Sequence, residues 1–339
     1  MQAYAFWNNK GGTGKTSLVF QSVCRYAESN KKARILVIDL CPQANLSELM
    51  LGGQEHGGNR NLLAAHERTP RCSIGGYFDA RLPSPFSPSG FQSKDYILTP
   101  GIFNSSIPAN IDLICGDPLL ELQAIAMNTL ANANLPGVNT WLAVNDWLKD
   151  LLDQVSGDYD LVFFDTNPSF SMYTQIGLAA ANRIILPVMA DDSSRRAVQN
   201  ALSLIYGIHL PSPVYAQYTF SSQMQKANRA LPQVHLIVKN RLTQYMGDAS
   251  AYSAVLAGID SDLSAAIASY PQYFTFGHPD DGLVSVRDFQ TVGVVSFALG
   301  CPVSIMPVGR LSISGHPVQV KREYRKDVLD SIDRVVKLI

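Results

Sequence analysis

The chain has 339 residues, 46% of them hydrophobic and 16% charged, which is enough to bury a large core in one or two domains. The net charge of -1 excludes a globally basic nucleic-acid binder, although a local basic patch stays possible. Five scattered cysteines without a Cys-x-x-Cys pair argue against a disulfide framework or a zinc site. With no signal sequence and no apolar run of spanning length, we expect a cytoplasmic protein without a transmembrane segment.

A glycine-rich turn stands between a predicted strand, Ala3–Trp7, and a predicted helix, Ser17–Glu28. The turn reads Asn9-Lys10-Gly11-Gly12-Thr13-Gly14-Lys15-Thr16-Ser17. Glycines let the backbone wrap tightly, so that several N–H groups and the helix N-terminus point at phosphate oxygens. Strand, turn and helix in this order predict a phosphate loop, with Lys15 on the β- and γ-phosphates and the Thr16 hydroxyl on Mg²⁺. The alternative is a surface turn rich in glycine and lysine.

Two later apolar runs each end in a carboxylate. Ile35–Asp39 reads as a strand buried on both faces of a parallel sheet, and Tyr159–Asp165 has the pattern of a Walker B strand. In a phosphate-loop fold, we expect Asp39 and Asp165 to lie beside the Mg²⁺ site. The alternative for Asp39 is a cap at the end of the strand.

The rest of the sequence alternates between segments with the apolar pattern of a strand and segments with that of a helix. Further strands are predicted at Tyr96–Pro100, 110–117 with its turn, Ile184–Val188, Val234–Arg241 and Val303–Pro307. Helices are predicted at Leu119–Ala133, Trp141–Gln154 and Ala197–Gly207, the last with Ser193 or Ser194 as N-cap, and 293–299 fits either state. We therefore expect an α/β fold, a doubly wound and mostly parallel sheet flanked by helices, with the nucleotide at the carboxyl ends of the strands.

We expect a single domain over residues 1–339. It carries an elaborated connection at about 52–108, rich in Gly, Pro, Ser and Asn, and a C-terminal helix at about 319–339. The connection should contain short helices.

The second, early lysine of the turn, Lys10, resembles the signature lysine of the deviant Walker A motif in ParA/MinD-type ATPases. The segment Asp39-Leu40-Cys41-Pro42-Gln43-Ala44-Asn45 is similar to a switch loop of the same family, and Gly315-His316-Pro317-Val318 looks like its late Gly-x-Pro-Val. The resemblance covers about Ala3 to Val318 and is weakest in 52–108 and 210–233. Two positions depart from it, because Cys41 replaces a second aspartate that helps orient the attacking water and Asn167 replaces a proline.

The resemblance implies an ATPase that uses ATP and Mg²⁺ and forms a homodimer on ATP binding. Lys10 would reach the nucleotide of the partner copy, as an arginine finger does. Asp39 and Asp165 would order the water ligands of the metal. The amide of Asn240, at the end of a predicted strand, would read the adenine, and a plain Asn turn is the alternative.

Among the functions of this family, the resemblance favours partitioning of DNA: a plasmid, a phage or a chromosome. It implies non-specific DNA binding, a ParB-like stimulating partner, slow hydrolysis and an association with the nucleoid. The candidate basic patch is Lys321, Arg322, Arg325 and Lys326, with Lys226, Arg229 and Arg241 as possible additions. The alternative is a positioning ATPase for a protein cargo or a membrane-associated machine. A nitrogenase-type reductase is excluded, since no cysteine stands between Asp165 and Gly300.

Overall fold

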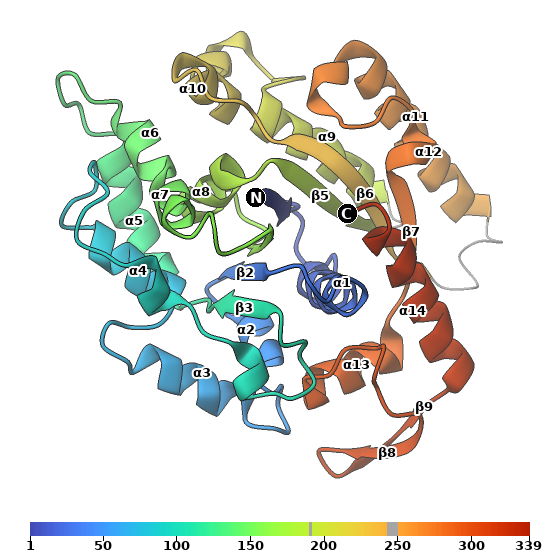
Figure 1. Cartoon of the computed structure of the whole chain (residues 1–339). Helices are drawn as coiled ribbons and strands as arrows, with labels where there is room; N and C mark the ends of the chain where they lie inside the picture. The colour runs from blue at the N-terminus through green and yellow to red at the C-terminus, as the bar shows by residue number, and fades with distance from the viewer. Residues whose placement is uncertain (190–191, 243–249) are drawn as a thin grey trace.

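The computed structural model describes residues 1–189, 192–242 and 250–339. Its centre is a parallel sheet of seven strands in the order β3-β2-β4-β1-β5-β6-β7 (Figure 1). The strands are β1 (Gln2–Phe6), β2 (Ile35–Leu40), β3 (Ile111–Ile114), β4 (Leu161–Thr166), β5 (Arg183–Met189), β6 (Gln233–Leu242) and β7 (Leu283–Arg287). The predicted doubly wound α/β fold is confirmed, and β1 lies between β4 and β5 at its centre.

Helices cover both faces of the sheet. One layer consists of α1 (Lys15–Ser29), α2 (Asn45–Met50), α3 (Gly58–His66), α13 (Gln290–Leu299) and α14 (Arg322–Val336). The other consists of α4 (Ile74–Arg81), α5 (Leu120–Ala131), α6 (Thr140–Asn145), α7 (Trp147–Gln154), α8 (Met172–Ala180), α9 (Asp192–Tyr206), α10 (Phe220–Lys226) and α11 (Ser250–Ser269). The short α12 (Pro279–Gly282) precedes β7.

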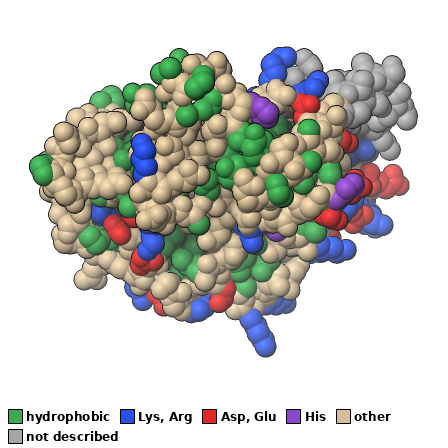
Figure 2. Space-filling view, turned by 90° about the horizontal axis from the view of Figure 1, so that it is seen from above, with side chains coloured by type: hydrophobic (Ala, Val, Ile, Leu, Met, Phe, Trp, Pro, Cys, Tyr) green, Lys and Arg blue, Asp and Glu red, His purple; other side chains and the backbone are tan. Residues whose placement is uncertain are grey.

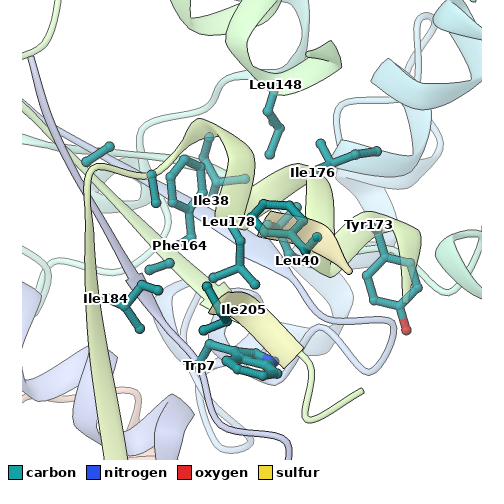
Figure 3. Packing of buried hydrophobic residues seen from close by; sticks show 14 of the residues in the cluster. Trp7, Ile38, Leu40, Leu148, Phe164, Tyr173, Ile176, Leu178, Ile184 and Ile205 are labelled. Atoms are coloured by element: carbon teal, nitrogen blue, oxygen red, sulfur yellow. The ribbon is translucent and has the colours of Figure 1, made fainter. Parts of the chain in front are cut away.

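Successive side chains of a strand enter opposite cores, because strand side chains alternate between the two faces. Ala5 of β1 and Trp7, which directly follows β1, pack in the core under α7, α8 and α9. Phe6 packs in the core under α1. Figure 3 shows residues of the first of these cores, among them Trp7, Leu40 and Phe164. Burial on both faces explains why these strands read as continuous apolar runs.

Two predicted strands are wrong. Around Tyr96–Pro100 the chain forms two 3-10 helices, η1 (Ser93–Tyr96) and η2 (Pro100–Ile102), and only a single bridge joins Leu98 to Leu113. Proline starts η2 because it supplies no N–H for a ladder. Val303–Pro307 forms a turn, in which the Val303 N–H donates to the Gln21 side chain (2.8 Å) instead of a neighbouring strand.

The predicted helix Trp141–Gln154 is two helices, α6 and α7, which meet at Asp146. The apolar period continues across the break because Val144, Leu148 and Leu151 all face the same core. The ambiguous segment 293–299 is helical, within α13. Helix α9 begins at Asp192, so Ser193 and Ser194 lie inside the helix, and their side chains fall outside the described residues.

The connection 52–108 contains α3, α4, η1 and η2, in agreement with the short helices expected there. Near the C-terminus, Gly315 forms the tip of an antiparallel hairpin, β8 (Gly309–Ile313) and β9 (His316–Val320), and α14 follows it. Within the part of the chain that the structure describes, every helix is too short or too polar to cross a bilayer.

Candidate nucleotide-binding site

The glycine-rich turn connects the centre of the sheet to α1. Gly12 and Gly14 adopt left-handed backbone conformations, with φ values of 74° and 75°, which residues with a Cβ rarely adopt. Gly14 is the N-cap of α1, no side chain caps the helix, and its first turn carries no acidic residue. The first N–H groups of α1 therefore remain available to an anion, at the positive end of the helix dipole.

The turn is braced by the ends of two neighbouring strands. The Asn8 amide donates to the Pro187 carbonyl of β5 (2.7 Å), and its Oδ1 accepts the Lys10 N–H (3.0 Å). From β6, the buried Asn240 amide donates to the Thr13 carbonyl (2.8 Å). Sequence reasoning missed Asn8, although an amide directly after the first strand was a weak signal. Asn240 does reach the site, but the contact that it makes is with the loop, and its role in adenine recognition stays a prediction.

The two lysines of the turn have different environments. Lys15 is buried, and its Nζ lies 3.5 Å from the Asn8 carbonyl. Burial lowers the pKa of Lys15, and the nearby Asp165 carboxylate opposes that shift. Lys10 is partly exposed, beside the exposed glycines Gly11 and Gly12. The buried lysine thus faces the interior of the site, and the early lysine lies at its outer edge.

Asp39 and Asp165 are register partners on β2 and β4. One Asp39 oxygen accepts the Cys41 N–H (3.1 Å), and the other accepts the Ser47 N–H (3.0 Å) and hydroxyl (2.7 Å). No close hydrogen bond to either oxygen of the buried Asp165 comes from the described residues, but the Thr16 hydroxyl is near enough to favour its charged form. Burial raises the pKa of both carboxyl groups, and for Asp165 the negative charge of Asp39 raises it further.

The Asp165 carboxylate and the neighbouring Thr16 hydroxyl fit a magnesium site. Mg²⁺ is usually held by one or two carboxylates and by phosphate oxygens, so a large acidic cluster is not required. Among the described side chains, no group of three or more His, Cys, Asp or Glu is arranged to hold a metal. Thr16 stands in the first turn of α1, directly after Lys15, as the predicted hydroxyl ligand. Asp39 is occupied by the loop that follows it, which suits an indirect role.

Cys41 lies in the position of the second aspartate expected from the resemblance. Its buried thiol donates to the Gln43 side chain oxygen (2.8 Å). Burial raises the pKa of the Cys41 thiol strongly, and the carboxylates of Asp39 and Asp165 add to this effect. The thiol therefore stays protonated at neutral pH.

The segment after β4 is tied to the start of the glycine-rich turn. Asn167 donates to the Tyr173 hydroxyl (2.7 Å). The Trp7 indole N–H donates to the Ser169 carbonyl (3.2 Å), and the Trp7 ring packs on Phe170 at 5.4 Å between centroids. Sequence reasoning missed Trp7 and Phe170, since an aromatic residue at a strand end gives no pattern of its own.

The candidate basic patch is only partly available. Arg325 donates to the Met306 and Ser304 carbonyls (2.5 and 3.0 Å), and Arg229 pairs with Asp146 (2.8 Å). The side chain of Arg241 lies outside the described residues. The remaining exposed cations at the start of α14 are Lys321, Arg322 and Lys326. We call these three residues the α14 basic group.

Residues 1–211 match a protein-family model described as "AAA domain". The chain is 30% identical over 187 residues to the cell division protein PomZ of Myxococcus xanthus, covering 55% of this chain and 46% of PomZ. It is 26% identical over 211 residues to the virulence plasmid ParA family protein pGP5-D of Chlamydia muridarum, covering 62% of this chain and 64% of that protein. The chain thus matches less than two thirds of the length of either relative.

Solved structures give the same fold over nearly the whole chain. Apo McdA from Cyanothece superimposes with a TM-score of 0.60 at 14% identity, covering 99% of both chains. An ATP complex of an McdA variant gives a TM-score of 0.62 at 14% identity, covering 100% of this chain and 96% of that one. At this identity the similarity shows the fold, a phosphate-loop NTPase sheet flanked by helices.

Proposed function

The chain belongs to the ParA/MinD-type ATPases, within the AAA domain family, and from this premise we propose that it is a dimerising switch that binds and hydrolyses ATP. The single observation that carries the proposal is the buried Asp165 carboxylate beside the Thr16 hydroxyl and Lys15. It makes no close hydrogen bond among the described residues, and its charge shifts the pKa of the Lys15 ammonium group. An unpaired buried carboxylate beside an anion-binding loop is costly unless a cation binds there. ATP bound with Mg²⁺ supplies both the anion for the loop and the cation for Asp165.

Each residue of the site then has a definite task. The amides of Gly11 to Ser17 and the Lys15 ammonium hold the phosphates. Thr16 and Asp165 would hold Mg²⁺, and Asp39 would orient its water ligands. The metal, when bound, offsets the charge of the β- and γ-phosphate oxygens.

The dimer rests on Lys10 at the outer edge of the site. Its position allows a second copy to approach the exposed Gly11 and Gly12. From there, Lys10 would neutralise charge on the γ-phosphate held by the partner copy, so that two copies make one catalytic unit. ATP binding would close the dimer and hydrolysis would open it.

We propose partitioning of DNA as the process that the switch serves. The α14 basic group presents three exposed cations close together, which suits phosphate backbones without sequence preference. The same proposal includes a location in the cytoplasm, in association with the nucleoid. It also includes a ParB-like partner that stimulates hydrolysis. The relatives named above include both a ParA family protein and a cell division protein, so positioning of a protein cargo is the second candidate.

The packing of α14 argues against a membrane-associated version of that second candidate. Val328, Ile332 and Val335 form the apolar face of α14, and all three are buried against α1 and the sheet. A helix that inserts in a membrane surface needs this face free.

Fluorescence anisotropy with a random-sequence DNA duplex distinguishes DNA partitioning from the positioning of a protein cargo. We expect binding with ATP and Mg²⁺ and much weaker binding with ADP. Replacing the three residues of the α14 basic group by Ala should make the negative slope of log affinity against log salt less steep, by roughly 3. The control replaces Lys31, Lys32 and Lys94, which are also exposed. An equal loss in both triple variants, or no DNA binding by the wild type, would favour protein cargo.

A further inference from the structure

A cavity of about 430 Å³ lies next to the segment that follows β4. Its walls come from α6, α8, α9 and the connection that leads into α10, a connection that includes η3 (Pro213–Tyr218). These elements lie together in Figure 1, and Figure 2 looks onto the side that carries α9 and α10, where hydrophobic side chains gather. The residues that hold the phosphate loop do not line this cavity.

The lining is aromatic and uncharged. The aromatic residues are Trp141, Phe170, Tyr215, Tyr218 and Phe220. Of the described residues that surround the cavity, none carries a charge, and the polar ones are amides and hydroxyls such as Asn200. Phe220 is 3% exposed, whereas Tyr215 and Tyr218 are 55% and 70% exposed on a 3-10 helix that buries none of its residues. Aromatic walls without charge select a neutral, planar group, with the tyrosines at the rim.

The cavity is connected to the nucleotide site by ring contacts. Phe170 meets Phe220 edge-on at 6.1 Å and packs against Trp7 at 5.4 Å. Trp7 is fully buried, holds the Ser169 carbonyl and directly precedes the Asn8 that braces the phosphate loop. The Phe170 ring therefore lines the cavity on one side and packs against Trp7, at the start of the loop, on the other.

We propose that this cavity binds one uncharged aromatic group and that its occupancy changes the rate of ATP hydrolysis through Phe170 and Trp7. The second half rests on the proposed function, whereas the first does not. The aromatic group belongs to a free small molecule, because a volume of about 430 Å³ lies in the range of small-molecule sites, and a side chain of a partner protein is the other source that the test distinguishes. Indole represents the first source and N-acetyl-tryptophanamide, a blocked residue, the second.

Calorimetric titration of the full chain without nucleotide tests the binding. We expect a dissociation constant at or below about 1 mM for the probe that fits, as befits a ligand of this size. Removing one rim ring with Tyr218→Ala should weaken binding roughly two- to tenfold. Val214→Ala is the matched control, because Val214 is 66% exposed on the same 3-10 helix and does not line the cavity.

The outcomes separate the sources. Equal affinity for both probes assigns the bare ring as the ligand, and tighter binding of N-acetyl-tryptophanamide assigns a partner side chain. Failure of both probes to bind, or equal affinity in Tyr218→Ala and the wild type, overturns the proposed site.

Single-turnover hydrolysis with saturating probe tests the connection. We expect at least a twofold change in the wild-type rate. Trp7→Phe keeps a ring against Phe170 but removes the hydrogen bond to Ser169, so it should bind the probe normally and lose most of the rate change. An unchanged wild-type rate overturns the connection. A chain that binds no ATP at all contradicts the proposed function, and the titration without nucleotide still decides the cavity.

Discussion

Asp39 and Asp165 occupy paired positions on neighbouring strands, yet their surroundings differ. Three hydrogen bonds fix Asp39 to the loop that follows it, whereas Asp165 has only the Thr16 hydroxyl nearby and makes no close hydrogen bond among the described residues. A carboxylate that already accepts from backbone and hydroxyl groups is a poor direct metal ligand. We therefore expect the two residues to differ in how they affect metal and nucleotide.

The first prediction compares Lys15→Ala with Asp165→Ala. In the proposed site Lys15 contacts phosphate directly, so its loss should weaken ATP binding at least tenfold, since hydrogen bonds to charged groups contribute about 1.5–3 kcal/mol. Asp165→Ala should retain most of the ATP affinity measured without metal and lose turnover that depends on Mg²⁺. Calorimetry with and without Mg²⁺ separates the two effects. Unchanged ATP affinity in Lys15→Ala would contradict the assignment.

The second prediction concerns Cys41. The protonated thiol donates to Gln43 and is a poor acceptor for a water molecule, so we expect slow basal hydrolysis with tight ATP binding. Cys41→Asp should accelerate single-turnover hydrolysis on the order of 10²-fold, by comparison with general-base contributions. Cys41→Ser is the control, because a hydroxyl adds no charge. Equal rates in the wild type and Cys41→Asp would mean that the thiol is only structural.

Some site residues were predictable from the sequence and others were not. Lys15, Thr16 and Asp165 stand at fixed places within a turn or at the end of an apolar run, so spacing alone brings them to one edge of the sheet. Asn8 and Trp7 gain their meaning from Pro187 and Ser169, which are far away in the chain. No local pattern encodes such contacts.

At the scale of elements, strands buried on both faces were the easiest to predict. Two of the boundaries that failed share one cause, which is that apolar residues pack into a core without forming the element that their pattern suggests. Val303 and Met306 are buried in a turn, and the stripe of α6 and α7 continues across Asp146. Burial and secondary structure are therefore separate properties of a segment.

The third prediction tests whether α14 is part of the core. Arg25 of α1 holds Asp333 of α14 through two hydrogen bonds (2.5 and 3.2 Å), and Ile332 is 1% exposed. Ile332→Ala should lower the free energy of unfolding by about 2–5 kcal/mol. Lys326→Ala, on the exposed side of the same helix, should change it by less than about 0.5 kcal/mol. Urea unfolding measures both, and a negligible effect of Ile332→Ala would mean that α14 detaches easily.

At the scale of the molecule, we propose that residues 1–339 form one domain. The core under α1 draws on Tyr4 of β1 and on Val335 of α14, so the beginning and the end of the chain support the same sheet. That arrangement places the phosphate loop at the centre of the sheet and leaves Lys10 at the outer edge of the site. We propose that a second copy completes this site.

Light scattering with ATP and Mg²⁺ tests that claim most directly, on the wild type, Lys10→Ala and the control Lys32→Ala, which removes an exposed lysine outside the loop. We predict a particle of twice the monomer mass for the wild type and for Lys32→Ala, and a monomer with little hydrolysis for Lys10→Ala. A wild type that stays monomeric with ATP, or a Lys10→Ala variant that dimerises and hydrolyses ATP normally, would contradict the account.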